Sequence, residues 1–462
     1  MSVALDRCAS RTVDALLPVT GADTHVPLVD GTVRRYVDLD SAASTPALTA
    51  VADRVREVLP YYASVHRGAG YLSGVSTALY ESSRATIARF VDARPDDVAI
   101  ITRNTTDSLN LLAGVVPAAA DGTPGRVLVL DSEHHANLLP WLERGADAVT
   151  VLAAAPTVAA TRAALAGALA AHPIALGAVA GASNVTGESL PLERVVALAH
   201  AHGARVVVDG AQLVPHRSIS LARLGADYVA FSGHKTYAPF GAGALVGRRD
   251  WLDVGTPHLA GGGAVRDVQR SRTLWQPAPA RHEAGSPNVL GAIALAEACE
   301  ALAGLPAGAL EEHEEALRAR LVDGLEQLDG VDVLRIWPDS GAPLGIVAFT
   351  VADQDAGLVA AYLSAEHGIG VRDGRFCAHR LLERLGASHG ALRASVGVGT
   401  TSEAVDRLLE GLATFLEQGP RATYAVVDHG WTVVDDPRPL PPIHGLDALA
   451  ATAAAGCGPV ED

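Results

Sequence analysis

The chain has 462 residues, of which 49% are hydrophobic and 19% charged, as in an ordinary globular protein large enough for two or three domains. Its 36 basic and 52 acidic residues give a formal charge of −16, which argues against nucleic acid or an anionic membrane as main partner. The N-terminus lacks the apolar core of a signal peptide, and prolines and charged residues interrupt the most apolar region, 148–182. We expect a cytoplasmic protein with no nucleic-acid or membrane partner.

Short β-rich runs alternate with alanine-rich helical stretches through the middle of the chain. Strands without polar alternation, separated by helices of 10–15 residues, predict a mostly parallel sheet covered on both faces. Ligands bind such sheets at the carboxyl ends of the strands. The expected strands are 96–102, 125–131, 148–153, 174–183, 204–211, 227–235 and 241–248, with helices at 158–171 and 192–203 among the segments between them.

The pattern changes after about residue 300. A long helical run at 307–328, alternating strands and a helix at 402–417 predict a smaller α+β domain. The last 40 or so residues, rich in proline, alanine and glycine, suggest an irregular tail. The domain organisation is therefore predicted as an N-terminal segment that joins the small domain (1–46), a large domain (47–300), the small domain (301–420) and a C-terminal extension (421–462).

Lys235 and Asp209 follow two successive apolar runs, in FSGHKTYAPFGAG and VVVDGAQ. A lysine in a desolvated pocket becomes a nucleophile that forms Schiff bases with aldehydes, although most single lysines are solvated surface charges. A buried aspartate needs a cationic partner, such as a pyridinium nitrogen, although it could equally cap the next helix. Together the two residues make pyridoxal 5'-phosphate a specific proposal for the cofactor.

The phosphate of such a cofactor needs a cradle of hydrogen-bond donors. Thr105 and Thr106 in NTTDSL open a helix whose N-terminus favours anions, although an ordinary helix cap explains them equally well. Ser232 and His234 could add donors, and His134 in DSEHHANLLPW could lie flat over a planar ring. Because no further ligand stands at a zinc-like spacing from His134, and because the four cysteines are widely scattered, we expect no metal site.

Several motifs in order resemble the cysteine desulfurases and selenocysteine lyases of the class V aminotransferases, which are fold-type I pyridoxal phosphate enzymes. The resemblance runs from YVDLDSAASTP (36–46) to about residue 415. It implies the fold-type I architecture, a large domain with a mostly parallel seven-stranded sheet plus a smaller α+β domain, and a homodimer. The matching motifs are SVHRGAGYLS, RNTTDSLNLLA, EHHANLLPW, SNVTGESLP, VDGAQLVPH, FSGHKTYAPFGAGAL, AGGGAV, HEAGSPNV and VRDGRFCAHRLL.

The resemblance also implies roles for individual residues. Lys235 is expected to form the Schiff base, Asp209 to pair with the pyridine nitrogen, and His134 to stack on the ring as a catalytic residue. Arg393 is expected to clamp the substrate carboxylate, with Arg372 assisting. The remaining residues implied for the cofactor are Asn184 and Gln212 near the ring hydroxyl, Thr105, Thr106, Ser232 and His234 at the phosphate, and Ser286 at the phosphate of a neighbouring subunit; Asn184 is also implied for substrate binding.

Cys377 decides the expected activity. In the family a loop cysteine attacks the substrate sulfur and leaves an enzyme persulfide and alanine, and RDGRFCAH places Cys377 at that point. The basic residues nearby favour the reactive thiolate, although a free cysteine is more often a small buried hydrophobic residue. Many relatives have HHC where this chain has RFC. The resemblance implies a cysteine desulfurase that converts L-cysteine to L-alanine and passes sulfur to an acceptor protein or a small thiol.

Two other interpretations use the same cofactor site. A C–S lyase, or another class V enzyme acting on a modified cysteine or related amino acid, would use β-elimination and would not need Cys377. A sulfur-relay protein of low turnover would bind the cofactor and pass sulfur on, with Cys457 in the tail as a possible acceptor. An NAD-dependent oxidoreductase is disfavoured because GAGALVG has the spacing GxGxxxG, which is wrong for a dinucleotide loop.

Overall fold

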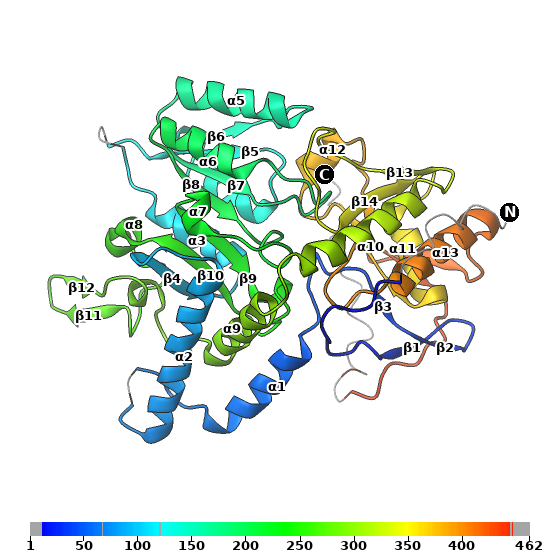
Figure 1. Cartoon of the computed structure of the whole chain (residues 1–462), viewed down its shortest axis with the longest axis horizontal. Helices are drawn as coiled ribbons and strands as arrows, with labels where there is room; N and C mark the ends of the chain where they lie inside the picture. The colour runs from blue at the N-terminus through cyan, green and yellow to red at the C-terminus, as the bar shows by residue number, and fades with distance from the viewer. Residues whose placement is uncertain (1–11, 67, 120–121, 444–445, 447–462) are drawn as a thin grey trace. The chain divides into compact units, whose positions relative to one another are not determined.

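A computed structural model describes residues 12–443 and 446, with the exception of 67 and 120–121 (Figure 1). The chain divides into two compact units. Of the residues that the structure describes, those within 44–311 and 336–344 form the large unit, and those within 12–43, 312–335 and 345–443 form the small unit. Residues 336–344, which lie inside the predicted small domain, pack in the large unit, where Trp337 Nε1 donates a hydrogen bond of 3.0 Å to the Ala155 carbonyl.

The large unit is built on a seven-stranded sheet (Figure 1). Only β10 is antiparallel to its neighbours β4 and β9, so the other six strands run in one direction. The predicted mostly parallel seven-stranded sheet is confirmed. The strand order is β4 (Asp97–Thr102), β10 (Gly243–Arg248), β9 (Tyr228–Ser232), β8 (Arg205–Asp209), β7 (Ile174–Ala180), β5 (Arg126–Leu130) and β6 (Val149–Leu152).

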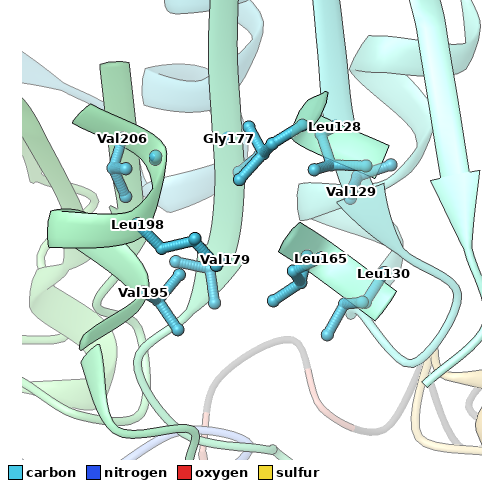
Figure 2. Close-up of a pocket in the computed structure, with 12 residues that line it drawn as sticks. Leu128, Val129, Leu130, Leu165, Gly177, Val179, Val195, Leu198 and Val206 are labelled. Atoms are coloured by element: carbon cyan, nitrogen blue, oxygen red, sulfur yellow. The ribbon is translucent and has the colours of Figure 1, made fainter. Parts of the chain in front are cut away.

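Both faces of this sheet are covered, which explains the continuous apolar runs of its strands. Successive side chains of a strand point to opposite faces. Leu176 and Ala178 of β7 therefore join one core cluster with Trp141 and Leu245, while Gly177 and Val179 face the opposite side. There they line a cavity of about 20 Å³ beneath helices α5 (Val158–Ala171) and α6 (Leu192–Ala201), shown in Figure 2.

Side chains at the helix starts satisfy the first free backbone N–H groups. Asn104 accepts from the Asp107 N–H, Thr157 from the Ala160 N–H and Asn288 from the Gly291 N–H. They begin α3 (Thr105–Val115), α5 and α9 (Val289–Ala303). The other helices and strands of the large unit are α1 (Thr49–Val58), α2 (Tyr71–Phe90), α4 (Leu139–Leu142), α7 (Leu221–Leu224), α8 (Arg249–Val254) and the hairpin β11 (Val265–Val268) and β12 (Thr273–Trp275).

The small unit holds an antiparallel sheet in the order β13 (Val331–Val333), β14 (Ile346–Val351), β17 (Ala391–Ser395) and β16 (Arg372–Gly374). The predicted helices at 307–328 and 402–417 are confirmed as α10 (Ala309–Leu325) and α13 (Ser402–Gln418). A core of buried side chains, among them Phe349 and Tyr362, joins this sheet to its helices. The remaining elements are α11 (Ala356–His367), α12 (His379–Arg384), the parallel pair β3 (Val37–Asp38) and β15 (Ile369–Gly370), and the pair β1 (His25–Pro27) and β2 (Val33–Arg35).

The expectation of an irregular tail is wrong for residues 424–433, while the described residues 434–443 contain no helix or strand. Residues 424–433 form a hairpin of β18 (Tyr424–Val427) and β19 (Gly430–Val433). The buried carboxylate of Glu366 holds the segment that leads into this hairpin. It accepts hydrogen bonds from the backbone N–H groups of Arg421 and Ala422 and from the Tyr424 hydroxyl, at 2.9, 3.0 and 3.2 Å. This long-range contact orders a segment whose composition resembles a loop.

Across the described ranges, no helix combines the length and the apolar character that a membrane span requires.

Candidate active site

The N-terminus of α3 meets the end of β9 at the predicted phosphate site. The Thr105 N–H donates to Ser232 Oγ at 2.8 Å, and the two hydroxyls lie 2.7 Å apart. A Cβ at Gly243 would lie 2.7 Å from the Asn104 Cα, so glycine at this position allows α3 to approach β10 so closely. The positive end of a helix and two hydroxyls therefore meet at the carboxyl edge of the sheet, an arrangement that suits an anion.

The other two residues predicted at the phosphate differ in exposure. Thr106 is exposed in the first turn of α3, while His234 is half-buried in the short turn after β9. Burial and the charge of the adjacent Lys235 lower the pKa of His234. A neutral imidazole there can donate one hydrogen bond to a bound anion and adds no positive charge.

Asp209 and Lys235 lie at the carboxyl ends of neighbouring strands and interact electrostatically. Asp209 is 6% exposed, and its Oδ1 accepts a hydrogen bond of 3.0 Å from the Ala211 N–H. Burial raises the pKa of Asp209, and the positive charge of Lys235 opposes this shift. Lys235 itself is half-buried. The structure thus brings together the carboxylate and the amine on which the cofactor prediction depends.

Glu133 is a second buried carboxyl group here, and it is not among the site residues predicted from the sequence. Its carboxyl is 3% exposed and accepts hydrogen bonds from Asn137 Nδ2 at 2.8 Å and from the Ala180 N–H at 3.1 Å. Burial, supported by the nearby charge of Asp209, raises the pKa of Glu133 to about 8. Its position three residues after the buried run of β5 is a usable signal, because an acidic residue that is buried beyond a strand end must find partners.

The predicted ring-binding residues come from three different connections. His134 begins the turn after β5, and its Nδ1 accepts from the Ala136 N–H at 3.0 Å, so the neutral ring carries its proton on Nε2. Asn184 follows β7 and is 6% exposed; Gln212 follows β8 and is 3% exposed. Each follows a strand at the carboxyl edge of the sheet, as the site requires.

Ser286 lies on an exposed loop that its neighbours hold firmly. Glu283 forms a two-pronged ion pair with Arg84, with N–O distances of 2.6 and 2.8 Å, and also accepts from the Ile101 N–H at 2.7 Å. At the other end of the loop, Asn288 Nδ2 donates to the Phe240 carbonyl at 2.7 Å. The serine predicted to reach a neighbouring subunit is thus exposed on an anchored loop.

The two arginines predicted to bind substrate belong to the small unit, whereas Asn184 belongs to the large unit. Arg393 in β17 is 3% exposed and pairs in register with Arg372 of β16. Arg393 Nη2 donates to Asp40 Oδ1 at 2.8 Å, and its guanidinium carbon lies 5.1 Å from the centre of the Phe376 ring. Burial lowers the pKa of Arg393, and Asp40 opposes this shift. Asp40 and Phe376 are not predicted from the sequence, because no local pattern reveals their contacts with Arg393.

Cys377 lies between β16 and α12 and is half-buried rather than fully exposed. Its negative form and the guanidinium of Arg393 attract each other. The structure describes one further cysteine, Cys299, whose complete burial raises the pKa of its thiol. Cys8 and Cys457 lie outside the described residues. Of the two described thiols, Cys377 is the one that solvent can reach.

The profile of the class-V aminotransferase family matches residues 37–408. The chain belongs to this family. It is 36% identical over 383 residues to a probable cysteine desulfurase of Vibrio cholerae, covering 81% of this chain and 92% of the relative. It is 35% identical over 378 residues to a cysteine desulfurase of Dickeya dadantii, covering 81% of this chain and 90% of the relative.

Solved structures agree with the family assignment. The cysteine desulfurase CsdA of Escherichia coli superposes with a TM-score of 0.73 at 34% identity, over 83% of this chain and 95% of that one. The cysteine desulfurase of Thermococcus onnurineus gives a TM-score of 0.74 at 30% identity, over 87% of this chain and 99% of that one. The chain therefore has the fold-type I architecture of the family, and the family's cofactor is pyridoxal 5'-phosphate.

The donor set of the large unit fits this cofactor. A helix N-terminus with two hydroxyls suits a phosphate, a half-buried amine suits an aldehyde, and a buried carboxylate suits a protonated ring nitrogen. In the described part of the chain, no cluster of three histidine, cysteine or acidic residues could hold a metal ion.

Proposed function

We propose that the protein is a pyridoxal phosphate-dependent cysteine desulfurase that converts L-cysteine to L-alanine and retains the sulfur as a persulfide on Cys377. The observation that carries the proposal is a solvent-reachable thiol at Cys377 directly after Phe376, whose ring centre lies 5.1 Å from the guanidinium carbon of the buried Arg393 in the same unit. The similarity to cysteine desulfurases over four-fifths of the chain supports it.

In the proposed reaction the large unit holds the cofactor. Thr105, Thr106, Ser232 and His234 hold the phosphate, and Asp209 holds the proton of the ring nitrogen. Asn184, Gln212 and His134 orient the ring. When bound, the cofactor would supply an aldehyde for the substrate amine and a protonated ring that draws electron density from the substrate carbons. Lys235 Nζ first holds the aldehyde and then moves the proton of the substrate Cα.

The small unit supplies the sulfur chemistry in this proposal. Arg393, assisted by Arg372, binds the substrate carboxylate through its guanidinium N–H groups. The Cys377 thiolate forms a bond to the substrate sulfur, and the Cβ–S bond breaks. Its electron pair leaves with the carbon, which takes up a proton and yields alanine. The persulfide on Cys377 then passes its outer sulfur to an acceptor protein or a small thiol.

The proposal includes a homodimer that acts in the cytoplasm. The exposed loop of Ser286, anchored by Glu283 and Asn288, is suited to reach the phosphate of a second subunit. Size-exclusion chromatography with light scattering tests this part, and a monomeric enzyme with full activity contradicts it.

The decisive experiment compares the wild type with Cys377→Ala, both loaded with cofactor and incubated with L-cysteine. We expect both proteins to show the visible absorbance of the bound cofactor and only the wild type to form alanine and sulfide. Because the variant lacks the attacking thiol, its alanine production should fall at least about 100-fold, since removal of a catalytic nucleophile costs that much or more. Cys299→Ala is the matched control and should leave the rate unchanged.

Other outcomes separate the alternatives. Equal activity of Cys377→Ala, or formation of pyruvate and ammonia, supports a C–S lyase and contradicts the desulfurase. A wild-type rate that rises only when a sulfur acceptor is added supports a relay protein. A colourless protein after loading contradicts the assignments of Lys235 and Asp209.

A further inference from the structure

Phe376, the residue before Cys377, has an unusual backbone and a buried side chain. Phe376 and Cys377 have φ angles of +50° and +52°, two successive residues in the left-handed region. Bulky residues rarely adopt this conformation, so the surrounding contacts must hold it. Phe376 is only 5% exposed, although Arg375 and Cys377 on either side of it are half-buried. The loop is therefore organised around this ring.

Both ends of the loop are fixed. The Ala378 N–H donates to the Arg375 carbonyl at 3.0 Å and closes the turn that contains Phe376 and Cys377. Leu381 and Leu382 of α12, directly after this turn, are buried at 1% and 0% exposure. The position of the Cys377 thiol thus depends on a short turn between two anchored segments. The Phe376 ring connects this turn to the interior of the unit.

One interior contact of Phe376 is Arg393. The guanidinium carbon lies 5.1 Å from the ring centre, and Asp40 Oδ1 binds Nη2 at 2.8 Å. A cation that has lost its water interacts more strongly with an aromatic face than an exposed one does. The aromatic ring and the carboxylate therefore restrain the guanidinium from two sides.

We propose that Phe376 is a positioning residue that couples the Cys377 turn to the guanidinium of Arg393. Its ring sets the orientation in which Arg393 receives the substrate carboxylate, and Arg393 in return holds the ring and with it the thiol. This inference rests on the proposed function of Cys377 and Arg393. The residue at this position is consequently a determinant of substrate affinity and thiol reactivity together.

The charges around the turn remain unchanged when Phe376 is replaced. They are Arg375 and His379 beside the thiol, Arg372 and Asp373 on β16, Arg393 on β17, and Asp40 after β3. A changed reactivity of Cys377 in a Phe376 variant therefore reports moved groups rather than a lost charge.

The test compares Phe376→Met, which keeps an apolar side chain and removes the ring, with Phe376→Tyr, which keeps the ring. Both are assayed as holoenzymes for the KM of L-cysteine and for the rate of Cys377 alkylation by iodoacetamide, measured by peptide mass. In Phe376→Met we expect the KM to rise and the alkylation rate to fall, each about 3- to 30-fold, the range of a cation–π contact. Phe376→Tyr should keep the KM and the alkylation rate close to those of the wild type.

Phe349→Met is the matched control, because Phe349 is fully buried in β14 of the same unit. It should lower the melting temperature at least as much as Phe376→Met and leave the KM and the alkylation rate near wild type. The proposal fails if Phe376→Met keeps both values, or if Phe349→Met changes them equally.

The two proposals can fail separately. If Cys377→Ala still produces alanine, the desulfurase proposal fails, while the alkylation rates of the Phe376 variants still decide the positioning role. If Cys377→Ala is inactive and Phe376→Met alkylates like the wild type, the desulfurase stands and the coupling is overturned.

Discussion

Two buried carboxyl groups lie near each other at the edge of the large sheet, Glu133 and Asp209. Their environments differ: Lys235 provides a positive charge for Asp209, whereas Glu133 is held by neutral donors from Asn137 and Ala180. Burial disfavours the charged form of both, and the negative charge of Asp209 adds to the rise in the pKa of Glu133. The pKa of Glu133 rises to about 8, so this carboxyl retains its proton well above the usual range of a glutamate.

The raised pKa of Glu133 predicts that the stability of the protein depends on pH. The folded-state pKa of Glu133 is about 8, above its ordinary value of 4.5. Its contribution to the free energy of unfolding is therefore fully present below about pH 4.5 and is lost as the pH rises toward 8. The loss is about 1.4 kcal/mol per pH unit in this window. Glu133→Gln cannot ionise, so the stability advantage of the wild type over the variant should shrink between about pH 5 and about pH 8.

Urea unfolding of both proteins across this pH range checks the prediction. Histidines that titrate in the same window contribute equally to both proteins and cancel in the comparison. Stability curves that run parallel from about pH 5 to about pH 8 would show that Glu133 is already ionised in the folded state.

At the scale of one element, β7 contains a glycine with room beside it. Gly177 lines the cavity beneath α5 and α6 (Figure 2), and an added Cβ would lie 3.7 Å from the Arg205 carbonyl and 3.9 Å from Val206 Cγ2, ordinary contact distances. Glycine in a strand costs conformational entropy on folding. Gly177→Ala should therefore raise the free energy of unfolding by about 0.5–1 kcal/mol.

Gly233 offers the matched control for this prediction. A Cβ there would lie 2.7 Å from the Ala242 carbonyl and 2.9 Å from the Ala238 carbonyl, so Gly233→Ala should destabilise the protein. Urea denaturation measures both variants. Equal effects of the two substitutions would show that the space at Gly177 is not available.

At the scale of the whole molecule, the chain adds a hairpin after the region that matches the family. The match ends at residue 408, and β18 and β19 follow it. Glu366, 2% exposed in α11, accepts four hydrogen bonds from residues 421–424. The attachment of the hairpin to the small unit thus depends strongly on one buried carboxylate.

Removal of this carboxylate should release the hairpin. Glu366→Ala deprives two backbone N–H groups, a guanidinium and a hydroxyl of their acceptor, and we expect a loss of about 2–3 kcal/mol in stability. Limited proteolysis should then cut near residues 420–430 faster than in the wild type. Glu410→Ala, on an exposed position of α13, serves as the control. An unchanged cleavage rate would mean that the β19 contacts with α11 hold the hairpin by themselves.

Much of the fold followed from local patterns. Apolar runs of β-branched residues, spaced by helices, predicted the seven strands of the large sheet, and the order of the motifs indicated the family. Lys235 and Asp209 were found because each ends a buried strand, and the ends of parallel strands must meet at one edge. These features are local, so they can be recognised in the sequence before the tertiary contacts are known.

What only the tertiary structure decided are contacts between distant residues. Arg393 binds Asp40, which lies 353 positions away in the sequence. It also contacts Phe376, which lies in a turn with two positive φ angles. Neither composition nor periodicity predicts these contacts. Glu133 acquires its raised pKa from burial and from Asp209, and Glu366 orders a tail that looked irregular. Burial and long-range electrostatics depend on the packed chain as a whole, whereas strand and helix patterns depend on neighbours in sequence.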